Sequence, residues 1–141
     1  MGVIQGRNCI NFNVNAAATI PAYRVLKLAA TSGVPRGVAL WDTATAAIAG
    51  ISQEQSVGNT GTSIWTAISG TAKAQAGASV SASALLTALT ATGEVVEATV
   101  PTFNTTTGNL PFLIGHALES GATGAAVEIL INITPMRLVQ A

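Results

Sequence analysis

The residues best suited to acid-base chemistry in this chain are its single histidine, His116, and its single aspartate, Asp42. A Ser-His-Asp hydrolytic triad would need both of them together with an activated serine. The Gly-x-Ser-x-Gly turn that presents such a serine is absent, because the stretch 50–54 ends in Glu54 instead of glycine. We therefore predict that the chain is not an enzyme and that His116 is an ordinary strand residue.

The other groups that could bind a metal or attack a substrate are equally isolated. Cys9 is the only cysteine, so the chain forms no internal disulfide, and one cysteine with one histidine cannot complete a zinc site. A pair of catalytic carboxylates could come from the later glutamates, but no motif directs two of them together. These glutamates are Glu94, Glu97, Glu119 and Glu128. We predict no metal, no cofactor and no catalytic residue.

Lys73 suggests a different chemistry, because its surroundings have the Gly and Val rhythm of lipoyl and biotinyl carrier domains. Such domains hold the modified lysine at the tip of a hairpin, whereas Lys73 lies inside 71–75, a predicted strand without turn residues. Gly58 and Gly61 lack the Lys-Ser ending of a phosphate-binding loop and fit turns. A carrier or an enzyme is the least favoured class; modification of Lys73, or a turnover lost in His116→Ala, would support it.

The composition indicates a protein that associates with itself. Charged residues make up 9% of the 141 residues, against about 25% in ordinary soluble domains, and the basic and acidic side chains cancel. Without a basic stripe to neutralise phosphates, we expect no nucleic-acid partner. The uncharged stretch 74–93 is too polar for a membrane span, so we expect no membrane. A surface with so little charge lacks the repulsion that keeps monomers apart.

The first fifteen residues differ from the rest of the chain. Ile10, Phe12 and Val14 alternate with asparagines, which predicts a strand with one apolar face and one amide-bearing face. Residues 1–8 show little periodicity and predict an arm that becomes ordered on a partner. We divide the chain into an arm with the first strand, 1–15, and a β-rich domain, 16–141. The start lacks the apolar core of a signal peptide, so we expect synthesis in the cytoplasm.

Short alternating segments separated by Gly, Pro, Ser and Asn recur along the remaining chain and predict strands. They are 23–28, 37–41, 48–52, 63–69, 72–76 and 95–100. Turn signals about every 8–12 residues are typical of a β-sandwich or a β-barrel. The segment 79–89 fits either a strand or one short helix, and 102–109 predicts a polar loop. No internal repeat with a fixed period is visible.

The clearest β signal lies toward the end of the chain. Apolar residues alternate within 112–118, and a Gly-rich loop follows at 120–124. In the next segment Val127, Ile129, Ile131 and Ile133 share one face. The pattern predicts a β-hairpin whose second strand supplies part of the core.

Three segments of the second half resemble small capsid decoration, or head cement, proteins of tailed bacteriophages. They are 76–82 (AGASVSA), 92–98 (TGEVVEA) and 113–119 (LIGHALE), the last followed by a Gly-bearing turn and 127–130. The resemblance implies a non-enzymatic, single-domain, all-β homotrimer on the outer surface of the phage capsid, where it cements neighbouring major-capsid subunits and stabilises the mature shell. Another phage structural β domain, associated with a tail tube or a fibre, is the alternative.

Under this resemblance, the partners are the major capsid protein and the chain itself, and the virion is the location. The arm and first strand then supply the candidate assembly contacts, which are Val3, Ile4, Arg7, Ile10, Phe12 and Val14. Arginines are further candidates for contacts to the shell, because a guanidinium binds carboxylates through two parallel hydrogen bonds. Besides Arg7, they are Arg24, Arg36 and Arg137.

Overall fold

The structure, a computed structural model, describes residues 7–16, 18–42, 46–57, 62–89, 92–98 and 112–135. Within these ranges the chain forms a nine-stranded sheet and no helix. The strands are β1 (Arg7–Val14), β2 (Val25–Leu28), β3 (Gly37–Leu40), β4 (Ile48–Ser52), β5 (Ser63–Gln75), β6 (Leu85–Ala88), β7 (Val95–Glu97), β8 (Phe112–Ala117) and β9 (Ala126–Pro135). The predicted all-β class is confirmed.

The first strands close into a five-stranded barrel, the first barrel, in the order β1-β3-β2-β4-β5. β1 closes it, because it pairs in parallel with β3 through Asn13 and Val14 and antiparallel with β5 along most of its length. Of the two predicted architectures, the barrel is therefore the correct one.

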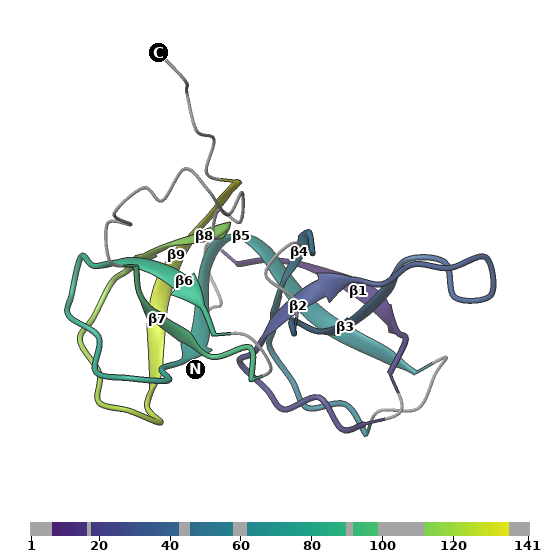
Figure 1. Cartoon of the computed structure of the whole chain (residues 1–141), viewed down its shortest axis with the longest axis horizontal. Helices are drawn as coiled ribbons and strands as arrows, with labels where there is room; N and C mark the ends of the chain where they lie inside the picture. Colours follow the sequence, from purple (N-terminus) through teal and green to yellow (C-terminus); the bar gives the residue numbers. More distant parts are fainter. Residues whose placement is uncertain are drawn as a thin grey trace, which may run out of the picture.

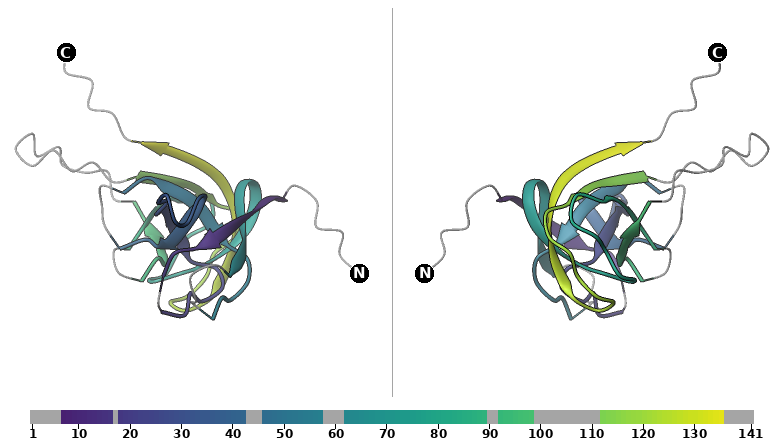
Figure 2. Two further views of the ribbon diagram at one scale, coloured as in Figure 1. Left: turned by 90° about the vertical axis from the view of Figure 1, so that its right-hand side faces the viewer. Right: turned by 90° about the vertical axis from the view of Figure 1, so that its left-hand side faces the viewer.

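The remaining strands form the second barrel, in the order β5-β9-β8-β6-β7. An isolated parallel bridge between Ala76, just after β5, and Val95 of β7 closes it. Figure 1 shows β5 running through both barrels, and Figure 2 shows β9 as a long curved strand beside β8. β5 thus belongs to both barrels.

Two predictions about elements need correction. The sequence predicts 63–69 and 72–76 as separate strands, but β5 contains both of them except Ala76, which follows its end. Gly70, which looks like a break in the sequence, lies inside the strand and pairs with Arg7 on β1 and Ile131 on β9. The segment 79–89 contains no helix and ends in β6. The predicted loop at 102–109 lies outside the described residues.

The two barrels repeat one arrangement of strands. The order β1-β3-β2-β4-β5 corresponds to β5-β7-β6-β8-β9, and in both barrels the first strand of this order pairs in parallel with the second. The other pairings are antiparallel. β5 is therefore the last strand of one barrel and the first strand of the next. The repeat has no fixed period, which is why the sequence does not reveal it.

Equivalent glycines mark the same irregularity in both barrels. Gly50 of β4 and Gly115 of β8 each lie beside a β-bulge, opposite β2 and β6 respectively. A Cβ atom at Gly50 would overlap the carbonyl oxygen of Ala67, and one at Gly115 would overlap that of Leu130. Both positions require glycine because the neighbouring backbone lies too close for any side chain.

Equivalent glutamates also make the same contact. Glu54 Oε1 accepts the backbone N–H of Trp65 at 2.9 Å, and Glu119 Oε1 accepts that of Glu128 at 2.7 Å. In each case a carboxylate after the fourth strand of its barrel binds the backbone of the fifth. The repeat therefore extends to side chains outside the core.

The core consists of two clusters. One fills the first barrel and contains Val14, Ile20, Leu26, Val38 and Ile64. The other fills the second barrel and continues across the junction to Val25, Trp41, Ile48, Ile51 and Ala67 of the first. The predicted core face of β9 is buried at Val127, Ile129 and Ile131, whereas Ile133 is half-buried and packs against the edge of this cluster. The shared cluster joins the barrels into one packed body.

Replacing Gly115 with alanine is expected to lower the free energy of unfolding by about 2–4 kcal/mol, because the new Cβ meets the Leu130 carbonyl at a strained backbone position. Gly33→Ala is the matched control, since nothing lies within 4 Å of its Cβ position. The control should change stability by less than about 1 kcal/mol. Urea unfolding of both variants measures the difference, and equal stabilities would contradict the close approach.

Candidate assembly surface

The structure places the predicted contact residues of β1 at different depths. Val14 is fully buried in the core of the first barrel, so its side chain has no surface to offer a partner. Ile10 and Phe12 are half-buried on the same strand, and Phe12 packs against that core. Arg7 begins β1 and pairs with Gly70, while Val3 and Ile4 lie outside the described residues. Of these side chains, Ile10 and Phe12 retain exposed surface.

The amide-bearing face of β1 binds the neighbouring turn. Asn13 donates from Nδ2 to the carbonyl of Pro35 at 2.6 Å, and Asn15 donates to that of Ala29 at 2.7 Å. Arg36 donates to the backbone oxygen of Asn11 at 3.0 Å, and its guanidinium lies 5.8 Å from the centre of the Phe12 ring. These bonds hold the turn before β3 against β1.

The groups considered for catalysis are not brought together. Asp42 accepts a hydrogen bond from Lys27 in the first barrel, at 2.6 Å, whereas His116 is exposed on β8 of the second barrel. Cys9 is half-buried on β1. Among the described residues, no group of three or more His, Cys, Asp and Glu could hold a metal ion.

Lys73 lies within β5, as predicted, and not at a hairpin tip. The described parts of the chain contain no helix that could span a membrane.

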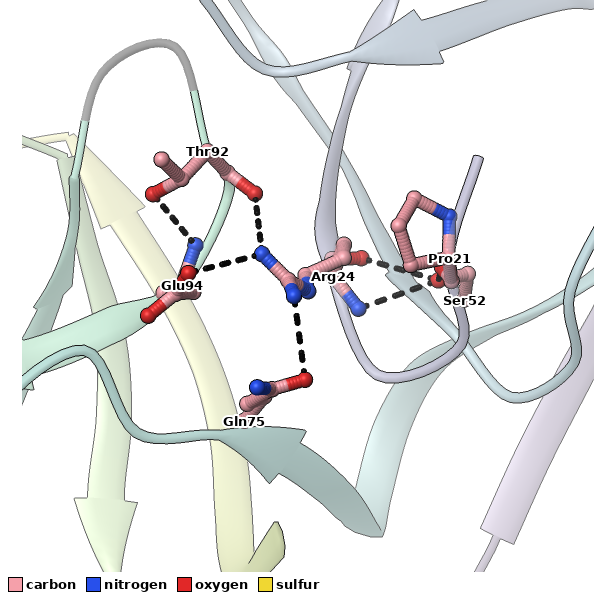
Figure 3. A network of polar contacts seen from close by, with 6 residues as sticks. All are labelled: Pro21, Arg24, Ser52, Gln75, Thr92 and Glu94. Atoms are coloured by element: carbon pink, nitrogen blue, oxygen red, sulfur yellow. Dashed lines mark hydrogen bonds and ion pairs between the residues drawn. The ribbon is translucent and has the colours of Figure 1, made fainter. Parts of the chain in front are cut away.

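Arg24 links the two barrels at a largely buried position (Figure 3). Its Nη1 contacts Glu94 Oε1 and the carbonyl of Thr92, each at 2.9 Å, and its Nη2 donates to Gln75 Oε1 at 3.0 Å. Its backbone N–H binds the hydroxyl of Ser52 at 3.0 Å. Arg24, predicted as a contact to the shell, therefore binds within the chain.

Backbone hydrogen bonds reinforce this junction. The N–H of Val25 on β2 donates to the carbonyl of Gly93 at 2.7 Å, and the N–H of Gln75 donates to that of Tyr23 at 2.9 Å. Gly93 has a φ of 66°, and a Cβ there would lie 2.8 Å from the oxygen of Val25. The turn before β7 consequently lies directly on β2.

Glu119 is exposed but held by defined partners. The backbone N–H of Glu128 and the ammonium of Lys73, which donates at 3.2 Å, keep the pKa of Glu119 below its ordinary value. Both partners stabilise the charged carboxylate.

Large apolar side chains also lie on the surface, a feature that alternation alone does not predict. Leu118 and Trp65 are each 49% exposed, and Leu130 is 44% exposed. The others among the described residues are Leu28, Val57 and Leu89. Exposed apolar groups that cluster are typical of interaction surfaces, whereas single ones need no explanation.

The comparisons with known proteins bear on the fold and not on the sequence family. The sequence matches no protein-family model and no curated protein. The fold matches the crystal structure of the head fiber gp8.5 N base of bacteriophage phi29, with a TM-score of 0.64 over 92% of this chain and 99% of that chain. The two sequences are 16% identical. The likeness concerns the fold, and it includes both barrels, because it extends over nearly the whole chain.

Arg24→Ala is expected to lower the free energy of unfolding by about 2 kcal/mol or more, because it leaves the Glu94 carboxylate, the Gln75 side chain and the Thr92 carbonyl without the donor that joins the two barrels. The control is Lys27→Ala, whose partner Asp42 has a side chain that is 52% exposed. The control should cost less than about 1 kcal/mol. Chemical denaturation compares the two, and equal losses would show that Arg24 does not stabilise the junction.

The acid titration of Glu119 provides a second test. Because its folded pKa is lowered, this carboxylate contributes stability above the ordinary carboxyl pKa and loses it as the pH falls through the lowered value. Lys73→Met should raise the pKa of Glu119 toward the ordinary value, and Lys27→Met should leave it unchanged. NMR titration of the side-chain carboxyl measures both variants. A pKa that does not respond to Lys73→Met would exclude the ion pair.

Proposed function

We propose that this chain is a structural protein of a bacteriophage virion. In this proposal it binds the outer surface of the head as a homotrimer, ties neighbouring major-capsid subunits together and thereby stabilises the mature shell. The observation that supports it most is the fold likeness to the base of a phage head fiber over nearly the whole chain. The low charge and the sequence segments 76–82, 92–98 and 113–119 support the same conclusion.

The mechanism follows from binding linkage. A protein that binds the assembled shell and not the dissociated subunits stabilises the shell by RT ln(1 + [L]/Kd), about 2.7 kcal/mol per site at a hundredfold excess over Kd. A head presents many equivalent sites, so a modest affinity at each one is sufficient. The role needs no catalytic residue, and the separation of His116 from Asp42 on different barrels is consistent with a non-enzymatic protein.

The fold suits attachment to a large assembly. Closed barrels leave few free strand edges, and free edges are the sites where β proteins aggregate. The packed cluster across the junction makes the two barrels a single body. A rigid body that presents several patches can contact more than one capsid subunit, which is the requirement for cementing.

A second candidate is the base of a fibre attached to the virion. The match to the head fiber base covers nearly all of that chain, so the same fold can serve as the base of a longer appendage. In that case the protein would bind the head and also a distal fibre segment. Stabilisation of the shell would then be secondary.

The test of the proposed function is to mix the purified protein with expanded heads that lack decoration. We expect the protein to sediment with the heads and to raise the temperature at which they release DNA. Purified tails are the control and should not bind. Sedimentation with tails alone, or binding to heads without any gain in heat resistance, would overturn the cementing role.

A truncated protein tests the arm separately. Removal of residues 1–6 leaves β1 intact, because the described strand begins at Arg7. We expect the truncated protein to retain its β-sheet circular dichroism and to occupy fewer sites on the heads at equal concentration. Equal occupancy would show that the arm does not contact the shell.

A further inference from the structure

The second barrel carries a row of three leucines and one histidine on its outer face. Leu85 on β6 pairs with His116 on β8, and His116 pairs with Leu130 on β9, so the three lie side by side across the sheet. Leu118 extends this surface beyond the end of β8. We call Leu85, His116, Leu118 and Leu130 the outer row. None of these side chains is buried, and Leu118 and Leu130 are almost half exposed.

The first barrel has the same row at the equivalent positions, and there it is covered. Val25 on β2 pairs with Ile51 on β4, and Ile51 pairs with Ala67 on β5. All three side chains are fully buried. They lie in the cluster that continues into the second barrel. Within one chain, then, this row is the surface on which another barrel of the same fold packs.

The outer row therefore occupies the position of an interface, but no described residue covers it. The repeat indicates which surface would pack on the outer row. The equivalent row of the first barrel is covered by the edge at which the second barrel begins. That edge contains Gln75 at the end of β5 and Gly93 before β7. In the first barrel, the equivalent edge lies between β1 and β3, with Asn13 and Arg36 at the corresponding positions. Arg36 and Gly93 share a positive φ, of 55° and 66°.

We propose that the outer row binds a second copy of this chain, at the edge of its first barrel between β1 and β3. Phe12 and Arg36 lie at that edge. The net charge of zero gives two copies no long-range repulsion, and the four side chains of the row carry no carboxylate or ammonium to desolvate.

The contact joins two different surfaces, so it is heterologous, and each copy offers one of each kind. A heterologous contact that closes forms a ring. This proposal rests on the trimer in the proposed function and identifies the surface that would form it. The proposed contact also includes the strand of the candidate contact residues Ile10 and Phe12, because both belong to β1.

Leu130→Asp tests the row, because it places a charge at the centre of the contact on a residue that is exposed within the chain. Val57→Asp is the matched control, since Val57 is 70% exposed and lies outside the row. We expect sedimentation equilibrium to show a closed oligomer for the unmodified chain and for Val57→Asp. Leu130→Asp should weaken self-association by about 30-fold or more. Thermal unfolding of diluted samples should confirm that both variants fold.

Association of Leu130→Asp equal to that of the unmodified chain would overturn the proposal. The proposal would also be overturned if the unmodified chain stayed monomeric at protein concentrations of tens of micromolar. Both measurements use the purified protein without phage heads, so they test the contact between copies separately from the cementing role. If the chain is a monomer that still binds and stabilises heads, the proposed contact between copies is wrong but the cementing role is supported. If the chain forms an oligomer that depends on Leu130 but binds no heads, the contact is supported and the cementing role is wrong.

Cysteine cross-linking tests which surfaces meet. In a Cys9→Ser background, Leu130→Cys is mixed with Arg36→Cys and oxidised, and each variant alone is the control. We expect cross-linked dimers in the mixture and few with either variant alone, because a disulfide requires Cα atoms within about 7 Å. Efficient cross-linking of Leu130→Cys with itself would overturn the head-to-tail arrangement.

Discussion

The shared strand β5 is the constraint on which the rest of the structure depends. Its first half presents Ile64 and Thr66 to the interior of the first barrel, and its second half presents small alanines to the second. Those alanines are Ala72 and Ala74, followed by Ala76 just after the strand. They occupy the same cluster as Trp41 and Ile51, so the small residues of one barrel leave room for the large residues of the other. A single continuous strand therefore contributes to the walls of both barrels, its first half to one and its second half to the other.

A chain with so few charges needs another means of fixing its loops, and it uses neutral side chains that bind backbone groups. Asn13 and Asn15 hold the turn before β3, and Gln53 donates to the carbonyl of Lys73 while accepting its N–H. Because neither the donor nor the acceptor of these hydrogen bonds is charged, their strength does not depend on the salt concentration. Among the described residues, three ion pairs join charged side chains, and the pair of Arg24 with Glu94 is the most buried of them.

Sequence alternation predicted most strands, because a barrel wall has one face inside and one face outside. The predicted bounds of β4 are those of the structure. β5 was divided in two because Ser69 and Gly70 look like a turn, although the crossing between barrels is where a glycine with a φ of 74° is needed. The sequence does not reveal the repeat, because the repeat has no fixed period and because equivalent positions hold different residues, such as Ala67 in the first barrel and Leu130 in the second. The outer row could not be recognised without that repeat, since an exposed leucine alone is uninformative.

The geometry of β5 also determines how the molecule would bear a pull. If one barrel is anchored and the other is drawn away along the strand, the load acts along β5, at right angles to its hydrogen bonds with β1 and β9. Bonds loaded in this way must break together instead of one after another, so the strand resists shear. Because β5 is continuous through both barrels, a force on one barrel passes directly to the other, with no flexible linker between them that could extend first.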